Sequence, residues 1–288
     1  MKEKPEIFHT IADMRGAVAR WRAAGERIAL VPTMGALHAG HISLVEASRA
    51  QVPRTQVSRC IVTIFVNPTQ FAANEDFGAY PRTLEADVEK LRAAGCDGCF
   101  APDAAEMYPP GFSTKVIPAG PALAGLEDRF RPDHFAGVAQ VVAKLLNQAG
   151  ADSAFFGEKD YQQLAVIRRM AGDLDIPTQI FGVPTLREPD GLAMSSRNVY
   201  LSALERQQAV ALSHVLRDSG VKIRAGADIA TTMASGAEEI AAAGFALDYL
   251  EARNAESLAP VATLADGPLR LLVAARLGRT RLIDNMAV

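Results

Sequence analysis

The chain has 288 residues, of which 49% are hydrophobic, and this length and composition supply a full core and exclude global disorder. The formal net charge of −3 lacks the basic excess of a protein that binds nucleic acid non-specifically. The charged N-terminus has no apolar signal-peptide core, and no apolar run reaches the length of a membrane span. We therefore expect a cytoplasmic protein with no nucleic-acid or membrane partner.

The first two thirds of the chain alternate between strand-like apolar runs and helical patterns with one apolar face. The predicted strands are 28–31, 57–66, 99–101, 153–156 and 176–183. The predicted helices between them are 40–51, 83–94, 134–149 and 161–171. This alternation predicts an α/β fold built on a Rossmann-like, doubly wound parallel sheet.

A stretch rich in Pro, Gly, Asp and Ser, 184–202, breaks the alternation. Two helical patterns and then three strand-like runs follow, at 203–219, 228–243, 245–252, 269–275 and 281–285. Helices followed by strands are typical of a small α+β domain. The predicted domains are therefore 1–186, which would bind the substrates, and 187–288, a smaller C-terminal lid domain.

Three cysteines are present, which is an odd number and gives no disulfide framework. Cys96 and Cys99 have C-x-x-C spacing, but the pair follows a helix end and runs into a strand, with no second pair after it. Packing in the core accounts for these residues better than zinc binding or redox chemistry.

The motif His38-Ala39-Gly40-His41 follows strand 28–31 and the turn 32–35, and it opens a helix. The start of a helix offers free N–H groups and the positive end of the helix dipole to an anion. Two imidazoles three residues apart share one face of the first turn, and both can donate hydrogen bonds to a triphosphate. Such a short pattern also arises by chance, and the histidines could be simple caps, so the motif alone leaves both interpretations open.

Two further polar clusters follow predicted strands, where ligands of open α/β sheets bind. Asn67 and Gln70 are neutral amides that suit a substrate with both hydroxyl and carboxylate groups, although an Asn-Pro turn is the simpler interpretation. Lys159 could reach a triphosphate and Asp160 could accept from ribose hydroxyls or assist a metal, with Gln163 one turn further on. A solvated helix cap is the alternative for the second cluster.

The stretch 190–198 contains a glycine, two hydroxyls and Arg197, which could hold two phosphate oxygens at once. Its composition fits a mobile phosphate clamp, and the alternative is a surface linker. We expect this stretch to be a mobile lid over the site.

These segments, in this order, resemble the family of pantoate–β-alanine ligases, or pantothenate synthetases, within the HxGH nucleotidyltransferase superfamily. The resemblance covers nearly the whole chain. The motifs that carry it are 32–35, 38–41, 64–71, 80–83, 134–138, 156–163, 194–198 and 280–285. Each motif is weak alone, but the ordered set is specific.

The resemblance implies an ATP-dependent condensation of pantoate with β-alanine to pantothenate, through a pantoyl adenylate, with release of AMP and pyrophosphate. It also implies Mg²⁺ with the ATP, and a homodimer. His41 is implied as the proton donor, with His38, Lys159 and Arg197 as the other catalytic groups, and Asp87 near the magnesium ion.

The resemblance also implies the residues that contact the substrates. ATP is assigned to Pro32, Thr33, Met34, His38, Gly40, His41, Gly157, Lys159, Asp160, Leu186, Met194, Ser195, Ser196 and Arg197. Pantoate and β-alanine are assigned to Gln70, Gln163, Asn67, Met34 and His134.

Another adenylyltransferase of the same superfamily is the nearest alternative, and it would release a stable adenylylated product instead of AMP. A catalytically silent nucleotide-binding regulator is a second alternative, which the complete set of His, Lys and Arg residues disfavours. A class I aminoacyl-tRNA synthetase would need an RNA-binding surface that the net charge does not indicate.

Overall fold

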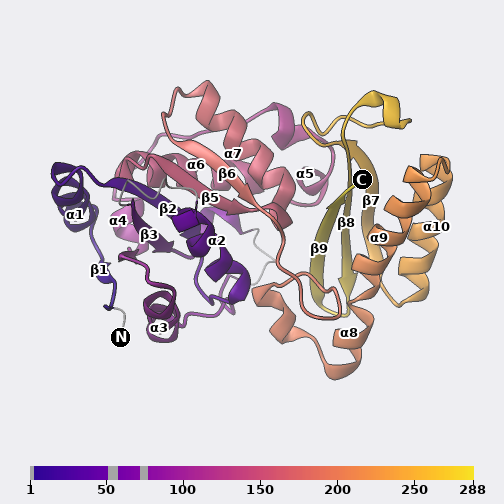
Figure 1. The fold of residues 1–288 in the computed structure, drawn as a ribbon, viewed down its shortest axis with the longest axis horizontal. Helices are drawn as coiled ribbons and strands as arrows, with labels where there is room; N and C mark the ends of the chain where they lie inside the picture. Colours follow the sequence, from indigo (N-terminus) through magenta and orange to yellow (C-terminus); the bar gives the residue numbers. More distant parts are fainter. Residues whose placement is uncertain (1–2, 51–57, 72–76) are drawn as a thin grey trace. The chain divides into compact units, whose positions relative to one another are not determined.

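The structure is a computed structural model that describes residues 3–50, 58–71 and 77–288 (Figure 1). Gln51, which ends the predicted second helix, and Val57, which begins the predicted second strand, lie outside these residues. The chain forms two compact units. The first unit comprises Met1–Ala122, Arg131–Glu158 and Gln163–Pro184, and the second comprises Leu123–Phe130, Lys159–Gln162 and Thr185–Val288.

The first unit contains a six-stranded sheet in the order β1-β4-β3-β2-β5-β6, with every pair of neighbours parallel. Its strands are β1 Glu6–Phe8, β2 Arg27–Thr33, β3 Ser58–Ile64, β4 Gly98–Phe100, β5 Ser153–Gly157 and β6 Gln179–Val183. The predicted doubly wound fold is confirmed. The short edge strand β1 was not predicted, because three residues carry too little periodicity to be recognised.

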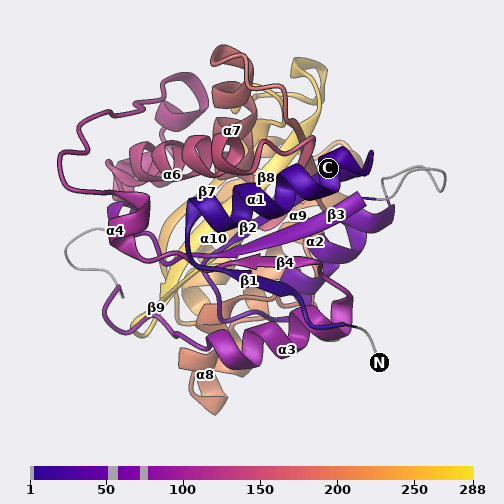
Figure 2. The ribbon, with the colours of Figure 1, turned by 90° about the vertical axis from the view of Figure 1, so that its left-hand side faces the viewer.

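Helices cover both faces of this sheet (Figure 2). They are α1 Ile11–Ala23, α2 Ala39–Ala50, α3 Leu84–Ala94, α4 Ala104–Met107, α6 His134–Ala149 and α7 Tyr161–Asp173, with the 3₁₀ turns η1 Pro68–Gln70, η2 Gly120–Leu123 and η3 Glu158–Asp160. Along β2, Ile28 and Leu30 join the core under α1 and α6, whereas Ala29 and Val31 join the core under α2 and α3. This alternation is the period of a strand buried on both faces.

Within the sheet, β3 and β4 follow on one side of β2, whereas β5 and β6 lie on the other side of β2. The strand order therefore reverses between β2 and β5, which are neighbours. Ligands of doubly wound sheets bind beyond the carboxyl ends of the strands at such a point. A ligand site is accordingly expected at the loops after Thr33 and Gly157.

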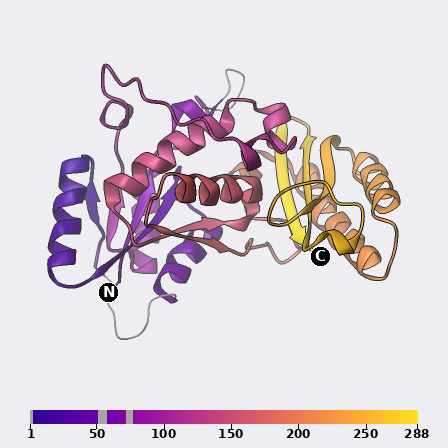
Figure 3. The same cartoon turned by 90° about the horizontal axis from the view of Figure 1, so that it is seen from above.

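The second unit contains a three-stranded antiparallel sheet, β7 Ala246–Asn254, β8 Leu269–Leu277 and β9 Thr280–Ala287. Its helices are α5 Glu127–Phe130, α8 Ala203–Gln208, α9 Ala211–Arg224 and α10 Ile229–Ala242, with the 3₁₀ turns η4 Ser196–Tyr200 and η5 Leu264–Asp266. Figure 3 shows the orange helices α9 and α10 along one side of the yellow strands. The predicted helix 203–219 is in fact two helices, α8 and α9.

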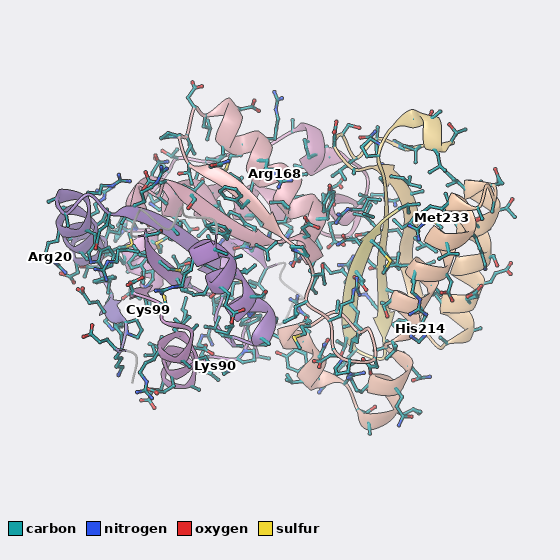
Figure 4. All side chains as sticks on the ribbon, in the orientation of Figure 1. Arg20, Lys90, Cys99, Arg168, His214 and Met233 are labelled. Carbon is teal, nitrogen blue, oxygen red and sulfur yellow. The ribbon has the colours of Figure 1, made fainter. Side chains whose placement is uncertain are left out.

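The three cysteines are buried, free thiols in the core beneath α2 and α3 (Figure 4 labels Cys99). The Cys96 thiol donates to the main-chain oxygens of Cys60 at 3.3 Å and Gly98 at 3.2 Å. Burial raises the pKa of Cys99 to about 12, so this thiol stays protonated. These residues pack in the core, and none of the described helices is long and apolar enough to span a membrane.

A buried ionic cluster braces the second unit. The Arg281 guanidinium donates to both Glu127 oxygens at 2.7 and 2.8 Å and to Asp248 at 2.7 Å, and the Tyr249 hydroxyl donates to Glu127 at 2.8 Å. Burial opposes the charge on Arg281, but the hydrogen bonds and proximity of the two carboxylates outweigh it and raise its pKa. The cluster joins α5 to β7 and β9.

We expect Arg281→Met to lower the free energy of unfolding by about 3–5 kcal/mol, because it removes the guanidinium that pairs with the buried Glu127 carboxylate and the largely buried Asp248 carboxylate. Urea denaturation of the purified protein measures this. The control is Arg276→Met, at an exposed position on the neighbouring strand, which should change stability by no more than about 0.5 kcal/mol. Equal effects of the two substitutions would contradict the structural role of the cluster.

Candidate active site

The H-x-G-H motif lies at the start of α2, directly beyond the end of β2. Gly35 and Ala36 both adopt left-handed backbone conformations, with φ of 83° and 49°, and this turns the chain out of the strand. The first turn of α2 closes on the main-chain oxygen of His38, which accepts from His41 N at 2.8 Å and Ile42 N at 3.2 Å. Both histidines are therefore at the positive end of a 12-residue helix.

The two imidazole rings are adjacent, and in each of them Nδ1 accepts a hydrogen bond from a main-chain N–H. Their ring centroids are 4.1 Å apart. Nδ1 of His38 accepts from Gly40 N at 3.1 Å, and Nδ1 of His41 accepts from His38 N at 3.2 Å. Because each Nδ1 is an acceptor, the proton of each neutral ring is on Nε2. Both rings therefore offer an Nε2–H donor, which is the group that a phosphate oxygen accepts from.

The carboxylate of Asp87 holds the turn before this motif. Asp87 is fully buried, at 0% exposed. One oxygen accepts from Ala36 N at 2.9 Å and the Thr83 hydroxyl at 3.0 Å, and the other accepts from Leu37 N at 2.8 Å, with Lys90 Nζ at 3.6 Å. Lys90, labelled in Figure 4, also donates to the main-chain oxygen of Leu37 at 2.6 Å. The start of α3 thus fixes the turn that leads to the histidines.

These contacts bear on the expected magnesium ion. Both oxygens of Asp87 already accept hydrogen bonds from protein donors, so a metal ion bound directly to Asp87 would compete with the contacts that hold the turn. Across residues 3–50, 58–71 and 77–288, no group of three or more His, Cys, Asp or Glu side chains is arranged to hold a metal ion. Among these described residues, side chains alone therefore do not form a metal centre, and the placement of Asp87 near magnesium stays a prediction.

Asn67 organises the segment that carries Gln70. Asn67 is 1% exposed, and its Nδ2 donates to Gln70 Oε1 at 2.9 Å and to the main-chain oxygen of Gly137 at 3.2 Å. Its Oδ1 accepts from the Tyr108 hydroxyl at 2.9 Å. Burial raises the pKa of Tyr108, which keeps this hydroxyl protonated as the donor. Asn67 is thus a brace for the Gln70 side chain, and its contact with substrate stays a prediction.

The N-terminal turn of α6 holds the main chain of the same segment. His134 Nδ1 lies 3.1 Å from the main-chain oxygen of Gln70, and Arg131 donates to that oxygen at 3.4 Å. At Gly137 the helix approaches so closely that a Cβ atom would lie 2.2 Å from the main-chain oxygen of Thr69. Only glycine fits there, and the structure brings His134 and Gln70 together, while their contact with substrate stays a prediction.

The motif at 156–163, which begins at the end of β5, has residues in both units. Gly157 ends β5 in the first unit, and Gln163 on α7 also belongs to that unit. Lys159 and Asp160 belong to the second unit, where the Lys159 ammonium lies 3.8 Å from an Asp160 oxygen. The side chain of Lys159 is 20% exposed. A partly exposed ammonium beside a carboxylate can bind an anion by giving up a weak contact.

The predicted lid stretch is an ordered hairpin followed by a 3₁₀ turn. Met194 N donates to the Leu186 oxygen at 3.0 Å, Arg187 forms an antiparallel bridge with Ala193, and Gly191 turns the chain with φ of 96°. The Ser195 hydroxyl then caps η4 by accepting from Arg197 N at 3.2 Å. Movement of this segment as a lid stays a prediction.

The two units therefore carry different sets of the predicted residues. The first holds Pro32, Thr33, Met34, His38, Gly40, His41, Asn67, Gln70, Asp87, His134, Gly157 and Gln163. The second holds Lys159, Asp160, Leu186, Met194, Ser195, Ser196 and Arg197. Sequence reasoning missed Tyr108 and Gly137 as supports of Gln70. Gly137 lay inside a recognised motif, but a lone tyrosine in a loop gave no signal.

A doubly wound parallel sheet with paired histidines at the first turn after β2 defines an α/β protein with an HxGH-type nucleotide site. Residues 6–287 match the model of the pantoate-beta-alanine ligase family, and the chain belongs to this family. The match confirms the family that the ordered motifs predicted.

Curated relatives and solved structures agree with this membership. Over 100% of both chains, the protein is 57% identical to pantothenate synthetase 2 of Bradyrhizobium diazoefficiens and 56% identical to pantothenate synthetase of Rhodopseudomonas palustris. The crystal structure of pantothenate synthetase from Thermus thermophilus superposes with a TM-score of 0.91 at 44% identity, covering 98% of each chain. A Francisella tularensis pantoate-beta-alanine ligase, complexed with beta-gamma ATP and beta-alanine, gives 0.80 at 32% identity, covering 98% of this chain and 97% of that one.

We expect Gly137→Ala to lower the free energy of unfolding by about 1–3 kcal/mol, because the new methyl group displaces the η1 turn. Chemical denaturation measures the change. The matched control is Gly16→Ala within α1, where no atom outside the backbone of the helix itself lies within 4 Å of the new Cβ. That substitution should stabilise the protein by about 0.5–1 kcal/mol. If both substitutions stabilise the protein, the close approach of α6 to η1 is wrong.

We expect Asp87→Asn to accelerate hydrogen exchange of the Ala36 and Leu37 amides by at least about tenfold in the ligand-free protein, because an amide NH₂ replaces an acceptor. Exchange followed by mass spectrometry or NMR measures this. Glu89→Gln, at an exposed position of the same helix, is the control and should leave both amides protected. Unchanged protection together with a raised Mg²⁺ requirement would instead favour a role at the metal.

Proposed function

We propose that this protein condenses pantoate with β-alanine at the expense of ATP, forming pantothenate, AMP and pyrophosphate. The observation that carries the proposal is the family match over residues 6–287. The paired Nε2–H donors at the start of α2 support it, since they suit the phosphates of a nucleotide.

In the first step, a carboxylate oxygen of pantoate attacks the α-phosphorus of ATP, and the bond from this phosphorus to the bridging oxygen breaks. Pyrophosphate leaves with the electron pair, and a pantoyl adenylate remains. The main barrier is the approach of one anion to another, so catalysis consists of positioning and charge stabilisation. We assign the phosphate contacts to His38 and His41 as hydrogen-bond donors, and to Lys159 and Arg197 as cations.

In the second step, the amine of β-alanine attacks the acyl carbon of the adenylate. The bond from that carbon to the phosphate oxygen breaks, AMP leaves with the electron pair, and the nitrogen loses a proton. Gln70 and Gln163 are assigned to hold pantoate, and Gln70 also reaches β-alanine. The supports of Gln70 by Asn67 and His134 favour this role, because they fix both its side chain and its main chain.

The proposal also includes a magnesium ion, a structural role for Asp87, a homodimer and a cytoplasmic location. Mg²⁺ is expected to arrive with ATP and to shield its phosphates when bound. Asp87 acts on the HxGH turn through Ala36 and Leu37. The homodimer and the cytoplasmic location implied by the resemblance are also proposals, and sedimentation of the purified protein tests the first of them.

Two measurements test the function. Incubation with MgATP, pantoate and β-alanine should produce pantothenate and AMP in equal amounts, detected by mass spectrometry. Exchange of labelled pyrophosphate into ATP should require pantoate but not β-alanine, because the adenylate forms first. His41→Ala should lower this exchange by at least about a hundredfold, the scale of one lost preorganised donor.

The control is His214→Ala, at an exposed histidine of α9 labelled in Figure 4, which should exchange like the unaltered protein. Exchange that needs β-alanine would favour a concerted reaction. A stable adenylylated product without free AMP would refute the ligase and favour another HxGH adenylyltransferase. A normal rate for His41→Ala would remove His41 from the mechanism.

A further inference from the structure

The motif at 280–285 contains three buried polar residues that the proposed mechanism leaves unused, Thr280, Asp284 and Asn285, of which the last two are adjacent. Asp284 and Asn285 are each 4% exposed, although they lie on β9, an edge strand of its sheet. Buried polar side chains are costly unless hydrogen bonded, so their partners indicate what they do. Because successive side chains of a strand point to opposite faces, the two residues reach different segments of the second unit.

Asn285 binds the segment that carries Lys159. Its Nδ2 donates to the main-chain oxygen of Lys159 at 2.8 Å, and its Oδ1 accepts from Arg270 at 2.6 Å. The Arg270 guanidinium lies 3.7 Å from the ring centroid of Tyr161, whose hydroxyl donates to the Ala255 oxygen at 2.8 Å. The main chain that bears the Lys159 ammonium is therefore fastened to the sheet on both sides of Asp160.

Asp284 binds the hairpin that leads to Arg197. Its two oxygens accept from both terminal nitrogens of Arg187, at 2.6 and 2.9 Å. Arg187 in turn donates to the main-chain oxygens of Gly191 at 3.0 Å and Asn285 at 3.2 Å. Gly191 is the tip of the hairpin from which Arg197 follows. One bidentate ion pair thus fastens this hairpin to β9.

We propose that Asp284 and Asn285 are positioning residues for the nucleotide, through which β9 holds Lys159 and the hairpin before Arg197 in one geometry. The inference rests on the proposed function, in which Lys159 and Arg197 contact the phosphates of ATP. Neither Asp284 nor Asn285 needs to touch ATP. Two cations that bind one polyphosphate must keep their spacing, and a shared strand provides it more rigidly than two independent loops do.

The test is the dissociation constant for ATP, measured by calorimetry without pantoate, in the full-length protein and its variants. Asn285→Ala and Asp284→Asn should each weaken ATP binding by about tenfold, the scale of one lost charge-assisted or buried hydrogen bond. In a protein that already carries Lys159→Ala, the further change Asn285→Ala should raise the dissociation constant for ATP by less than about twofold, because its effect passes through Lys159. Asp284→Asn should still weaken ATP binding by about tenfold in the Lys159→Ala protein, because it acts through Arg187.

Two controls separate positioning from general stability. Leu282→Ala, on the same strand but in the apolar core under α9, should lower the stability and leave ATP binding within about twofold. Asn285→Asp keeps an acceptor for Arg270 but loses the donor to Lys159, so it should weaken binding as Asn285→Ala does.

The outcomes are distinct. Equal effects of Asn285→Ala with and without Lys159, or weakened binding in Leu282→Ala, would overturn the inference. Unaltered protein that binds ATP but makes no pantothenate would refute the proposed function while the ATP-binding comparison still decides the inference. Protein that does not bind ATP would refute both.

Discussion

Main-chain polar groups in irregular segments must find partners where neither a helix nor a sheet supplies them, and this requirement shapes every segment assigned to the substrates. The turn after β2 meets it with Asp87, which accepts from Ala36 and Leu37. The η1 turn meets it with Asn67 and with His134 of α6. Asp87 is a buried side chain of α3, Asn67 is the buried cap residue of η1 itself, and His134 is a half-buried residue of α6. Together they fix segments that no ladder of backbone hydrogen bonds holds.

This arrangement separates support from chemistry. Asp87 and Asn67 are almost completely buried, and their hydrogen bonds are made within the protein. Lys159, by contrast, keeps a partly exposed side chain while only its main chain is held by Asn285. A group that binds a substrate must be able to exchange partners, whereas a group that holds a loop must not. Polar residues of the motifs thus fall into two kinds that the sequence does not distinguish.

In the second unit, charged side chains join irregular segments and a short helix to the sheet. Its ionic cluster around Arg281 joins α5 to the sheet, and the Arg187–Asp284 pair joins the hairpin to β9. Burying such pairs costs desolvation, which strong, bidentate hydrogen bonds can offset. Bidentate pairs fix the relative orientation of the two side chains as well as the distance between them. Apolar packing alone leaves more freedom of orientation.

The sequence by itself determined the α/β class and the family, whereas the residues that it assigns to ATP stay predictions. Strand and helix periods and ordered motifs are local properties, which can be read without knowledge of distant contacts. The predicted boundaries failed where local signals were short or misleading, as at β1 and at the break between α8 and α9.

Only the tertiary structure decided what several motif residues do. The place of Asp87 near a metal stays a prediction, but the structure shows that its oxygens hold a turn some 50 residues earlier in the chain. The approach of Gly137 to Thr69 and the grip of Asn285 on Lys159 likewise join distant residues, 126 positions apart in the second case. Such pairs depend on how elements pack in three dimensions, and one sequence contains no periodic pattern that encodes them.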